Sequence, residues 1–246
     1  MIKELRLAIK LTSDVVHLLR ENYMHDAKII NSIGKDIKTD ADLAANEHIH
    51  NELTKTGIKV ISEESENKSF NINENQWIVD PIDGTLNFSR GFGMAAVSIS
   101  LWDNGFPLLG VVNNIFYDEL FYSSSNNGSF RNDKRINVSS ISKASNAIIC
   151  TGFPISTNYS NNHLYNSIMK VKKYKRIRML GSASLMLSYV ACGMFDIYIE
   201  DNIYIWDVAA GLSLINEAKG RYFITQGNSV LTFDVKASNS LLDIGC

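Results

Sequence analysis

The sequence predicts a layered α/β fold, and three features of the chain carry that prediction. Apolar residues recur at helical spacing near the N-terminus, short apolar runs alternate with further helical segments, and two turns containing Asn-Gly lie between strand-like runs in the middle. Alternating helices and strands favour helices packed on sheets, and tight turns favour antiparallel hairpins. We therefore expect sheets with both kinds of connection, covered by helices.

The first third of the chain predicts two helices and two strands that end in acidic residues. Leu5, Ile9, Val16 and Leu19 have the spacing of one face of a helix. The expected elements are a helix over 2–25, a helix from Asp40 or Asp42 to Leu53, a strand over 58–61 leading to Glu63, and a strand over 77–79 leading to Asp80.

The middle of the chain predicts two hairpins, because Asn-Gly supplies the positive φ angles of tight turns. Their strands are expected over 96–102 and 108–113, and over 120–123 and 129–131. The last third predicts strands over 147–151 and 197–199 and helices over 162–173, 182–192 and 207–218. A polar stretch over 138–146 suggests two halves, 1–140 carrying most candidate metal ligands and 141–246 carrying Asp207 and substrate-side residues.

Composition limits the class of protein. The chain has 246 residues, 45% of them hydrophobic, and a formal net charge of −2, which argues against a surface that coats nucleic acid. Three scattered cysteines predict free thiols and a reducing, cytoplasmic compartment. No secretion signal is visible, and the apolar stretch over 180–199 contains too many Gly and Ser residues for a membrane span.

Four clusters of acidic residues stand at junctions between apolar runs and turns, and the central one is the segment from Trp77 to Thr85. Asp80 follows an apolar run and Asp83 stands three residues later, next to Gly84-Thr85. Two carboxylates this close repel each other in a partly buried site unless a cation lies between them. The other clusters are Asp40-Ala41-Asp42, Ser62-Glu63-Glu64-Ser65 and the segment from Trp206 to Gly211.

These residue types select both a metal and a reaction. No His or Cys accompanies the acids, and sites made only of oxygen suit Mg²⁺ or Mn²⁺. Two magnesium ions would nearly balance Glu63, Asp80, Asp83 and Asp207, and backbone N–H groups at Gly84 and Thr85 could hold an anion. The pattern indicates metal-assisted hydrolysis of a phosphate ester.

The same segments resemble the inositol monophosphatase family of magnesium-dependent phosphomonoesterases. The resemblance rests on Trp77 to Phe88, on Ser62-Glu63-Glu64-Ser65 and on Trp206 to Gly211, and it extends to Thr151–Pro154 and Gly181–Ser184. It implies a layered αβαβα sandwich, hydrolysis by a metal-activated water without a phosphoenzyme, two or three Mg²⁺ ions with Mn²⁺ as a substitute, lithium sensitivity and a homodimer.

The resemblance also implies a role for each site residue. One metal would be held by Glu63, Asp80 and the carbonyl of Ile82, a second by Asp80, Asp83 and Asp207, and a weaker third would again use Glu63. Thr85, supported by Asp42, would activate the water. The amides of Gly84 and Thr85 would hold the phosphate, and Glu200 would contact substrate hydroxyls.

Two departures from the family pattern concern the site. Lys38-Thr39 precedes the first acidic pair where relatives have Val-Thr, so Asp40 competes with Asp42 as the partner of Thr85, although the spacing to Leu43 favours Asp42. Arg90-Gly91 replaces a common His-Gly, which leaves the substrate open.

The basic run from Lys170 to Arg178 has two interpretations. It is either a solvated helix end followed by an edge strand or a binding patch, in which Arg178 would contact a second phosphate or a subunit partner.

The expected function is therefore the hydrolysis of a small polyol or sugar phosphate, with inositol monophosphate as the leading substrate. The alternatives are a nucleotidase for 3′-phosphoadenosine 5′-phosphate, a fructose-1,6-bisphosphatase and a histidinol-phosphatase. A member that binds ligands without turnover is the non-enzymatic alternative. Neither nucleic acid nor a membrane is expected as a partner.

Overall fold

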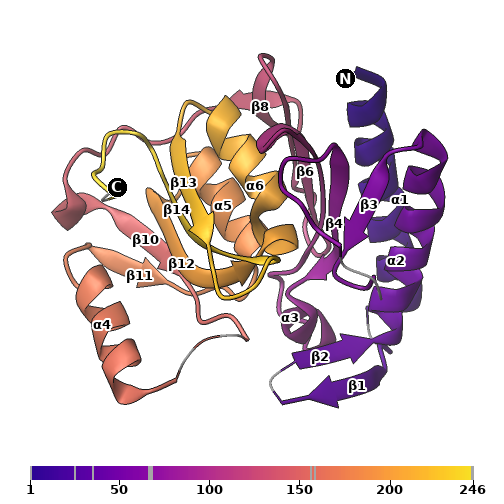
Figure 1. Ribbon diagram of the computed structural model, residues 1–246, viewed down its shortest axis with the longest axis horizontal. Coiled ribbons are helices and arrows are strands. Elements are labelled where there is room, and N and C mark those ends of the chain that lie inside the picture. The colour runs from indigo at the N-terminus through magenta and orange to yellow at the C-terminus, as the bar shows by residue number, and fades with distance from the viewer. Residues whose placement is uncertain are drawn as a thin grey trace.

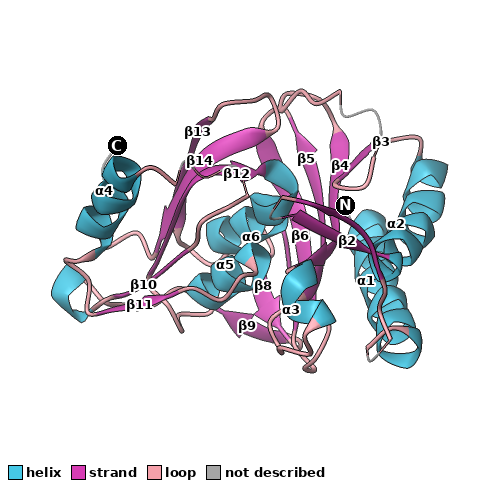
Figure 2. Ribbon diagram, turned by 90° about the horizontal axis from the view of Figure 1, so that it is seen from below, coloured by secondary structure: helices cyan, strands magenta, loops and turns pink. Residues whose placement is uncertain are grey.

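The computed structural model describes residues 2–24, 26–34, 36–65, 69–155, 157 and 159–244. The elements form five layers in the order helix, sheet, helix, sheet, helix (Figures 1 and 2). The predicted αβαβα sandwich is therefore confirmed. The expected end of the first helix at residue 25 and the thiol of Cys246 lie outside the described residues.

A seven-stranded sheet forms the second layer. Its strands are adjacent in chain order, and every pair is antiparallel except the parallel pair of the first two. They are β3 (Lys59–Ser62), β4 (Gln76–Asp83), β5 (Ala96–Asp103), β6 (Phe106–Asn114), β7 (Leu120–Ser124), β8 (Gly128–Arg131) and β9 (Lys134–Ile136). The helices α1 (Ile2–Asn22) and α2 (Asp40–Leu53) cover its outer face.

A five-stranded sheet forms the fourth layer, in the order β11-β10-β12-β14-β13. Its strands are β10 (Ile148–Thr151), β11 (Arg176–Arg178), β12 (Ile197–Tyr204), β13 (Arg221–Gln226) and β14 (Thr232–Ser238). The helices α5 (Ala183–Ala191) and α6 (Ile205–Glu217) lie between the two sheets, and α4 (Asn161–Val171) lies on the far face of the smaller sheet (Figure 1).

Several short elements complete the fold. A hairpin of β1 (Ile29–Ile33) and β2 (Asp36–Thr39) precedes α2, and α3 (Thr85–Ser89) follows β4. Two 3₁₀ turns, η1 and η2, cover Thr54–Thr56 and Ala144–Asn146.

The two predicted hairpins are confirmed. Asn104 and Asn126 have positive φ angles of 51° and 65°, and each is part of the turn between two paired strands. The end of the basic run forms the edge strand β11, as the first interpretation of that run predicted. The sequence prediction contained no element after Ala218, whereas β13 and β14 lie there. No residue of the edge strand β13 is buried, so its hydrophobic periodicity is weak.

One buried core spans the sheets. The strands of the larger sheet end at Ile136 and those of the smaller sheet begin at Ile148, on either side of the stretch 138–146. However, α5 and α6 pack against both sheets, so Leu187 and Ala209 share a cluster with Trp102 from the first half of the chain. The division into 1–140 and 141–246 stays a prediction about the chain.

Within the described residues, no helix combines the length and the apolar character needed to cross a membrane. The cysteines Cys150 and Cys192 are free thiols, the first of them buried.

Candidate active site

An irregularity in β4 brings two carboxylates to one face of the larger sheet. Side chains alternate between faces of a strand, so residues three apart normally point to opposite sides. Asp80 pairs with Ser98 and Asp83 with Ala96, so β4 has one more residue than β5 over this interval. This β-bulge places both acids on the same face of the sheet. Before the bulge, Ile78 points to the inner face; after it, Ile82 points to the outer face. The strand is longer than the predicted 77–79, because it begins at Gln76 and continues through Pro81 to Asp83.

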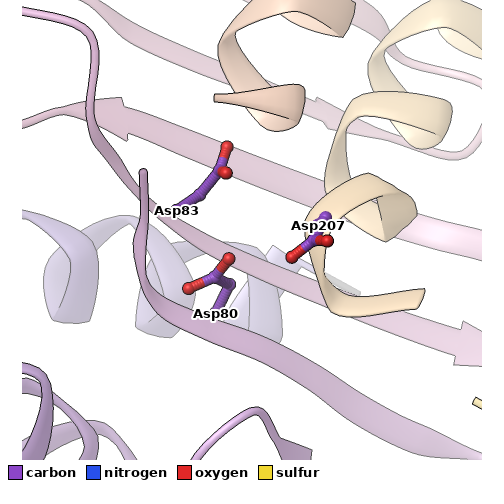
Figure 3. Close-up of side chains that lie close together, drawn as sticks. All are labelled: Asp80, Asp83 and Asp207. Atoms are coloured by element: carbon purple, nitrogen blue, oxygen red, sulfur yellow. The ribbon is translucent and has the colours of Figure 1, made fainter. Parts of the chain in front are cut away.

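The third carboxylate comes from the helix layer. Asp207 is the third residue of α6, which begins at Ile205, two residues earlier than predicted. Oxygen atoms of Asp80, Asp83 and Asp207 all lie within 4.8 Å of one another. Figure 3 shows the three side chains gathered at one place, with Asp207 approaching from α6.

Burial raises the pKa of all three acids, and repulsion from neighbouring carboxylates also raises the pKa of Asp80 and Asp207. For Asp80 the largest cause is burial, followed by the charges of Glu63 and Asp83. For Asp207 burial again comes first, followed by Asp83 and Glu63. Burial also raises the pKa of Asp83, against hydrogen bonds that lower it. Carboxylates held together in this way favour a cation or a proton between them.

Glu63 and Ile82, whose carbonyl is the predicted ligand, line the crevice beside the three aspartates. Glu63 directly follows β3, and its backbone N–H donates to the carbonyl of Val79 at 3.2 Å. Its side chain lines the crevice that contains the three aspartates. The donor set is therefore made of oxygen alone, which fits Mg²⁺ or Mn²⁺ by its chemistry.

Asp83 joins the two halves of the chain. Its carboxylate accepts hydrogen bonds from the hydroxyls of Ser182 and Ser184 and from backbone N–H groups in the first turn of α5. A helix N-terminus carries unpaired N–H groups and partial positive charge, so it stabilises a carboxylate there. The acid on β4 thus caps a helix about a hundred residues away in the sequence.

Asp42, and not Asp40, faces Thr85. The Thr85 hydroxyl lies 3.0 Å from Oδ1 of Asp42 and 3.0 Å from the carbonyl of Ile82. The other oxygen of Asp42 accepts from the backbone N–H and the hydroxyl of Thr39 in a capping box at the start of α2. Burial, the largest cause, raises the pKa of Asp42 to about 6. Asp40 instead accepts from the backbone N–H of Lys28.

Gly84 forms the passage from β4 into α3. Its φ of 91° is unfavourable for residues with a side chain, and an added Cβ would lie 2.9 Å from the carbonyl oxygens of Gly181 and Met94. Glycine at this position lets the chain pass between them and begin α3 at Thr85. Backbone N–H groups of Gly84 and Thr85 are therefore placed beside the acids, where they could hold an anion.

Glu200, on β12 of the smaller sheet, also lines the crevice, which has a volume of about 300 Å³. It is buried on β12, and burial, followed by the charge of Asp83, raises its pKa to about 8. Gly152 makes room for it, because a Cβ there would lie 2.4 Å from Oε1 of Glu200. A protonated Glu200 can donate a hydrogen bond to a hydroxyl group.

The structure thus brings together eight of the predicted site residues, from both halves of the chain. Glu63, Asp80, Ile82, Asp83, Gly84, Thr85, Glu200 and Asp207 line the crevice. Asp42 lies behind Thr85. Arg178 does not line the crevice; it is exposed on the edge strand β11, and its Nη1 donates to the carbonyl of Ile177 at 3.0 Å.

Sequence reasoning missed two contributions to the site. It did not assign a role to the hydroxyls of Ser182 and Ser184, whose signal is a serine pair at the start of an apolar helix. It noted Lys38 as a departure but not its ion pair with Glu64, the neighbour of Glu63. Both contacts join segments that are distant in the sequence, so the serine pair could be noticed locally but the partners in both contacts could not.

Comparisons with known proteins agree with this assignment of site residues to a phosphatase family. The inositol monophosphatase family model matches residues 3–243. The chain belongs to the inositol monophosphatase family.

An inositol-1-monophosphatase of Mesorhizobium japonicum is 37% identical over 188 residues, covering 75% of this chain and 71% of that protein. A fructose-1,6-bisphosphatase/inositol-1-monophosphatase of Thermotoga maritima is 33% identical over 216 residues, covering 87% and 81%. The solved structure of a Thermotoga maritima IMPase has a TM-score of 0.83 and 31% identity, covering 97% of this chain and 93% of that one. Membership in this family supports a phosphatase, which is a hydrolase.

Proposed function

We propose that this protein is a Mg²⁺-dependent phosphomonoesterase that hydrolyses a small polyol or sugar phosphate, with inositol monophosphate as the leading substrate. The observation that carries the proposal is the convergence of Asp80, Asp83 and Asp207, with oxygens within 4.8 Å of one another, beside the start of α3. Glu63 and the carbonyl of Ile82 complete the proposed metal ligands. When bound, magnesium supplies positive charge that activates water and stabilises the phosphoryl group in transfer.

The remaining residues have roles in holding the substrate and moving a proton. The backbone N–H groups of Gly84 and Thr85 bind phosphate oxygens, as helix N-termini do. The Thr85 hydroxyl orients the attacking water and passes a proton toward Asp42, whose ionised carboxylate accepts the hydrogen bond at 3.0 Å. Glu200 binds a hydroxyl group of the polyol from β12.

One variant tests the metal assignment. Asp83→Asn keeps the shape of the side chain but removes its charge, so turnover should fall below detection while the circular dichroism spectrum is unchanged. Asp103→Asn, on the neighbouring strand β5, is the matched control and should retain wild-type turnover. Near-normal phosphate release by Asp83→Asn would refute the assignment.

A second cavity keeps the nucleotidase as an alternative. It has a volume of about 130 Å³ between α4 and the smaller sheet, and it shares Glu200 and the segment Gly152–Pro154 with the crevice. Its lining is mostly apolar, which suits a nucleobase more than a polyol. Phosphate release from inositol 1-phosphate, 3′-phosphoadenosine 5′-phosphate, fructose 1,6-bisphosphate and histidinol phosphate, compared side by side, would decide between them. Mg²⁺ binding in calorimetry without release from any of the four would favour a non-enzymatic member.

We also propose a homodimer. Large apolar side chains that are more than a third exposed gather in the segment from 153 to 179, namely Phe153, Ile155, Tyr159, Tyr165, Ile168, Met169, Ile177 and Met179. Phe153, Ile168, Ile177 and Met179 line one cavity, and exposed apolar side chains that lie together commonly mark protein–protein contacts. Light scattering coupled to gel filtration should give twice the chain mass of 27.5 kDa; a monomer at micromolar concentration would contradict the proposal. A cytoplasmic location stays a prediction from the cysteine content.

A further inference from the structure

The two carboxylate oxygens of Asp83 have different surroundings. Oδ2 accepts from the Ser182 hydroxyl at 2.7 Å, the Ser184 backbone N–H at 2.7 Å and the Ser184 hydroxyl at 2.5 Å. Oδ1 accepts from the backbone N–H of Ala183 at 3.3 Å. A carboxylate oxygen has two lone pairs, and three short donors occupy those of Oδ2. Oδ1 is therefore the oxygen with which Asp83 would bind a cation.

The Ser184 hydroxyl differs from the other donors to Oδ2. Any residue except proline at position 184 would supply the backbone N–H, and Ser182 is the N-cap of α5, where a serine is favoured for the helix alone. Ser184 is the second residue of α5 and is fully buried, at 0% exposure. A buried hydroxyl needs a hydrogen-bond partner, and the Ser184 hydroxyl donates to Asp83.

We propose that Ser184 is a positioning residue of the metal site: its hydroxyl fixes Asp83 against α5, so that Oδ1 faces Asp80 and Asp207 before a cation arrives. The inference rests on the proposed function, because it assumes that these acids bind Mg²⁺. It assigns to Ser184 the orientation of a ligand, and not contact with the metal or the substrate.

The physical reason is the repulsion among the acids. Without a cation, the charges of Asp80 and Asp207 favour any rotation of Asp83 that takes its carboxylate away from them. A side chain that must return to one orientation on binding gives up rotamer freedom, which weakens the affinity. Hydrogen bonds to the oxygen that does not bind metal oppose that rotation in advance. Partners of this kind typically change metal affinity by about 10- to 100-fold.

The helix itself supplies a matched control. Ser188 lies one turn later on α5, is also 0% exposed, and donates its hydroxyl to the carbonyl of Ser184 at 2.7 Å. Ser184→Ala and Ser188→Ala therefore remove the same group from the same buried helix. Of the two hydroxyls, that of Ser184 donates to a candidate metal ligand.

The experiment measures Mg²⁺ binding to metal-stripped protein by isothermal titration calorimetry. For Ser184→Ala we expect the half-saturating Mg²⁺ concentration to rise about tenfold, and for Ser188→Ala we expect a change of less than about twofold. The Mg²⁺ concentration that gives half-maximal phosphate release should shift in parallel, while kcat at saturating Mg²⁺ stays within about threefold because every ligand is retained. Thermal unfolding of the metal-free variants checks that both are folded.

A second variant separates the hydrogen bond from the volume of the side chain. Ser184→Cys is close in size to the wild type but donates only weakly, so its Mg²⁺ affinity should also fall. Wild-type affinity in Ser184→Cys together with weak binding in Ser184→Ala would overturn the inference in favour of packing. Wild-type affinity in Ser184→Ala would overturn it directly, while leaving the proposed function intact. No Mg²⁺ or Mn²⁺ binding by the wild type would overturn the proposed function itself and this inference with it.

Discussion

The helices α5 and α4 cover opposite faces of the same five-stranded sheet, and they differ in how much of each is buried. All nine residues of α5 are buried, and its first turn binds Asp83. None of the eleven residues of α4 is buried, and a cavity separates it from the sheet. The crevice therefore has a closely packed side that carries the acids and an open side next to the cavity. The comparison indicates that the chemistry depends on the buried contacts of the packed side, whereas the residues of the open side can vary with the substrate.

The largest expected effect tests whether the packed side carries the catalysis. Asp42→Asn or Thr85→Val should each lower kcat by about 10²- to 10⁴-fold, because each interrupts one proton path. The double variant should lose little more than either single one, since the two residues act as a unit. Thr85→Ser should keep most of the activity. Ser167→Ala, in the lining of the cavity beside α4, is the control and should change kcat by less than about threefold.

Stability should show the same contrast between the two helices. Leu187 on α5 is fully buried between the sheets, and Leu187→Ala should lower the free energy of unfolding by about 2–5 kcal/mol. Ile168 on α4 is 58% exposed in the single chain, so in the monomeric protein Ile168→Ala should cost less than about 0.5 kcal/mol. Urea unfolding followed by circular dichroism measures both. Equal losses would show that α4 is as well packed as α5, for example by a partner subunit.

Removing the metal should make stability depend on pH in a defined direction. Burial raises the pKa of Asp42 to about 6 and that of Glu200 to about 8, so the folded state binds protons more tightly than the unfolded state. Stability without metal is then greatest at low pH and falls as pH rises through these values, by up to about 1.4 kcal/mol per pH unit for each group. For a chain of this size, 1 kcal/mol corresponds to about 2–4 °C in the melting temperature.

The melting temperature in EDTA should thus be several degrees lower at pH 8 than at pH 6, and saturating Mg²⁺ should reduce the difference. Glu200→Gln should flatten the fall between pH 7 and pH 8. Glu47→Gln, which changes an exposed acid on α2, should not. A melting temperature in EDTA that rises with pH would contradict the burial of these charges.

The smallest expected effect concerns the basic edge strand. Arg178 lies outside the crevice, so Arg178→Ala should change kcat/KM for a monophosphate by less than about twofold. The same variant measured with fructose 1,6-bisphosphate sharpens the comparison. A loss limited to the bisphosphate would show that Arg178 binds a second phosphate, as the basic run allowed.

The chemical elements of the site were readable from the sequence because local rules govern them. The acids Glu63 and Asp80 follow apolar runs typical of strands, and these runs form β3 and β4. Hairpins centred on Asn104 and Asn126 follow from turn chemistry alone. The family resemblance added the layer order and the role of each acid.

Only the tertiary structure decided how these pieces meet. The bulge that turns Asp80 and Asp83 to one face depends on pairing with β5, and the choice of Asp42 over Asp40 depends on how α2 packs beside α3. The contacts of Asp83 with Ser182 and Ser184 join residues about a hundred positions apart. Local propensity acts over a few residues, whereas contacts like these exist only after the layers have packed, so the sequence could predict the ligands but not their orientation.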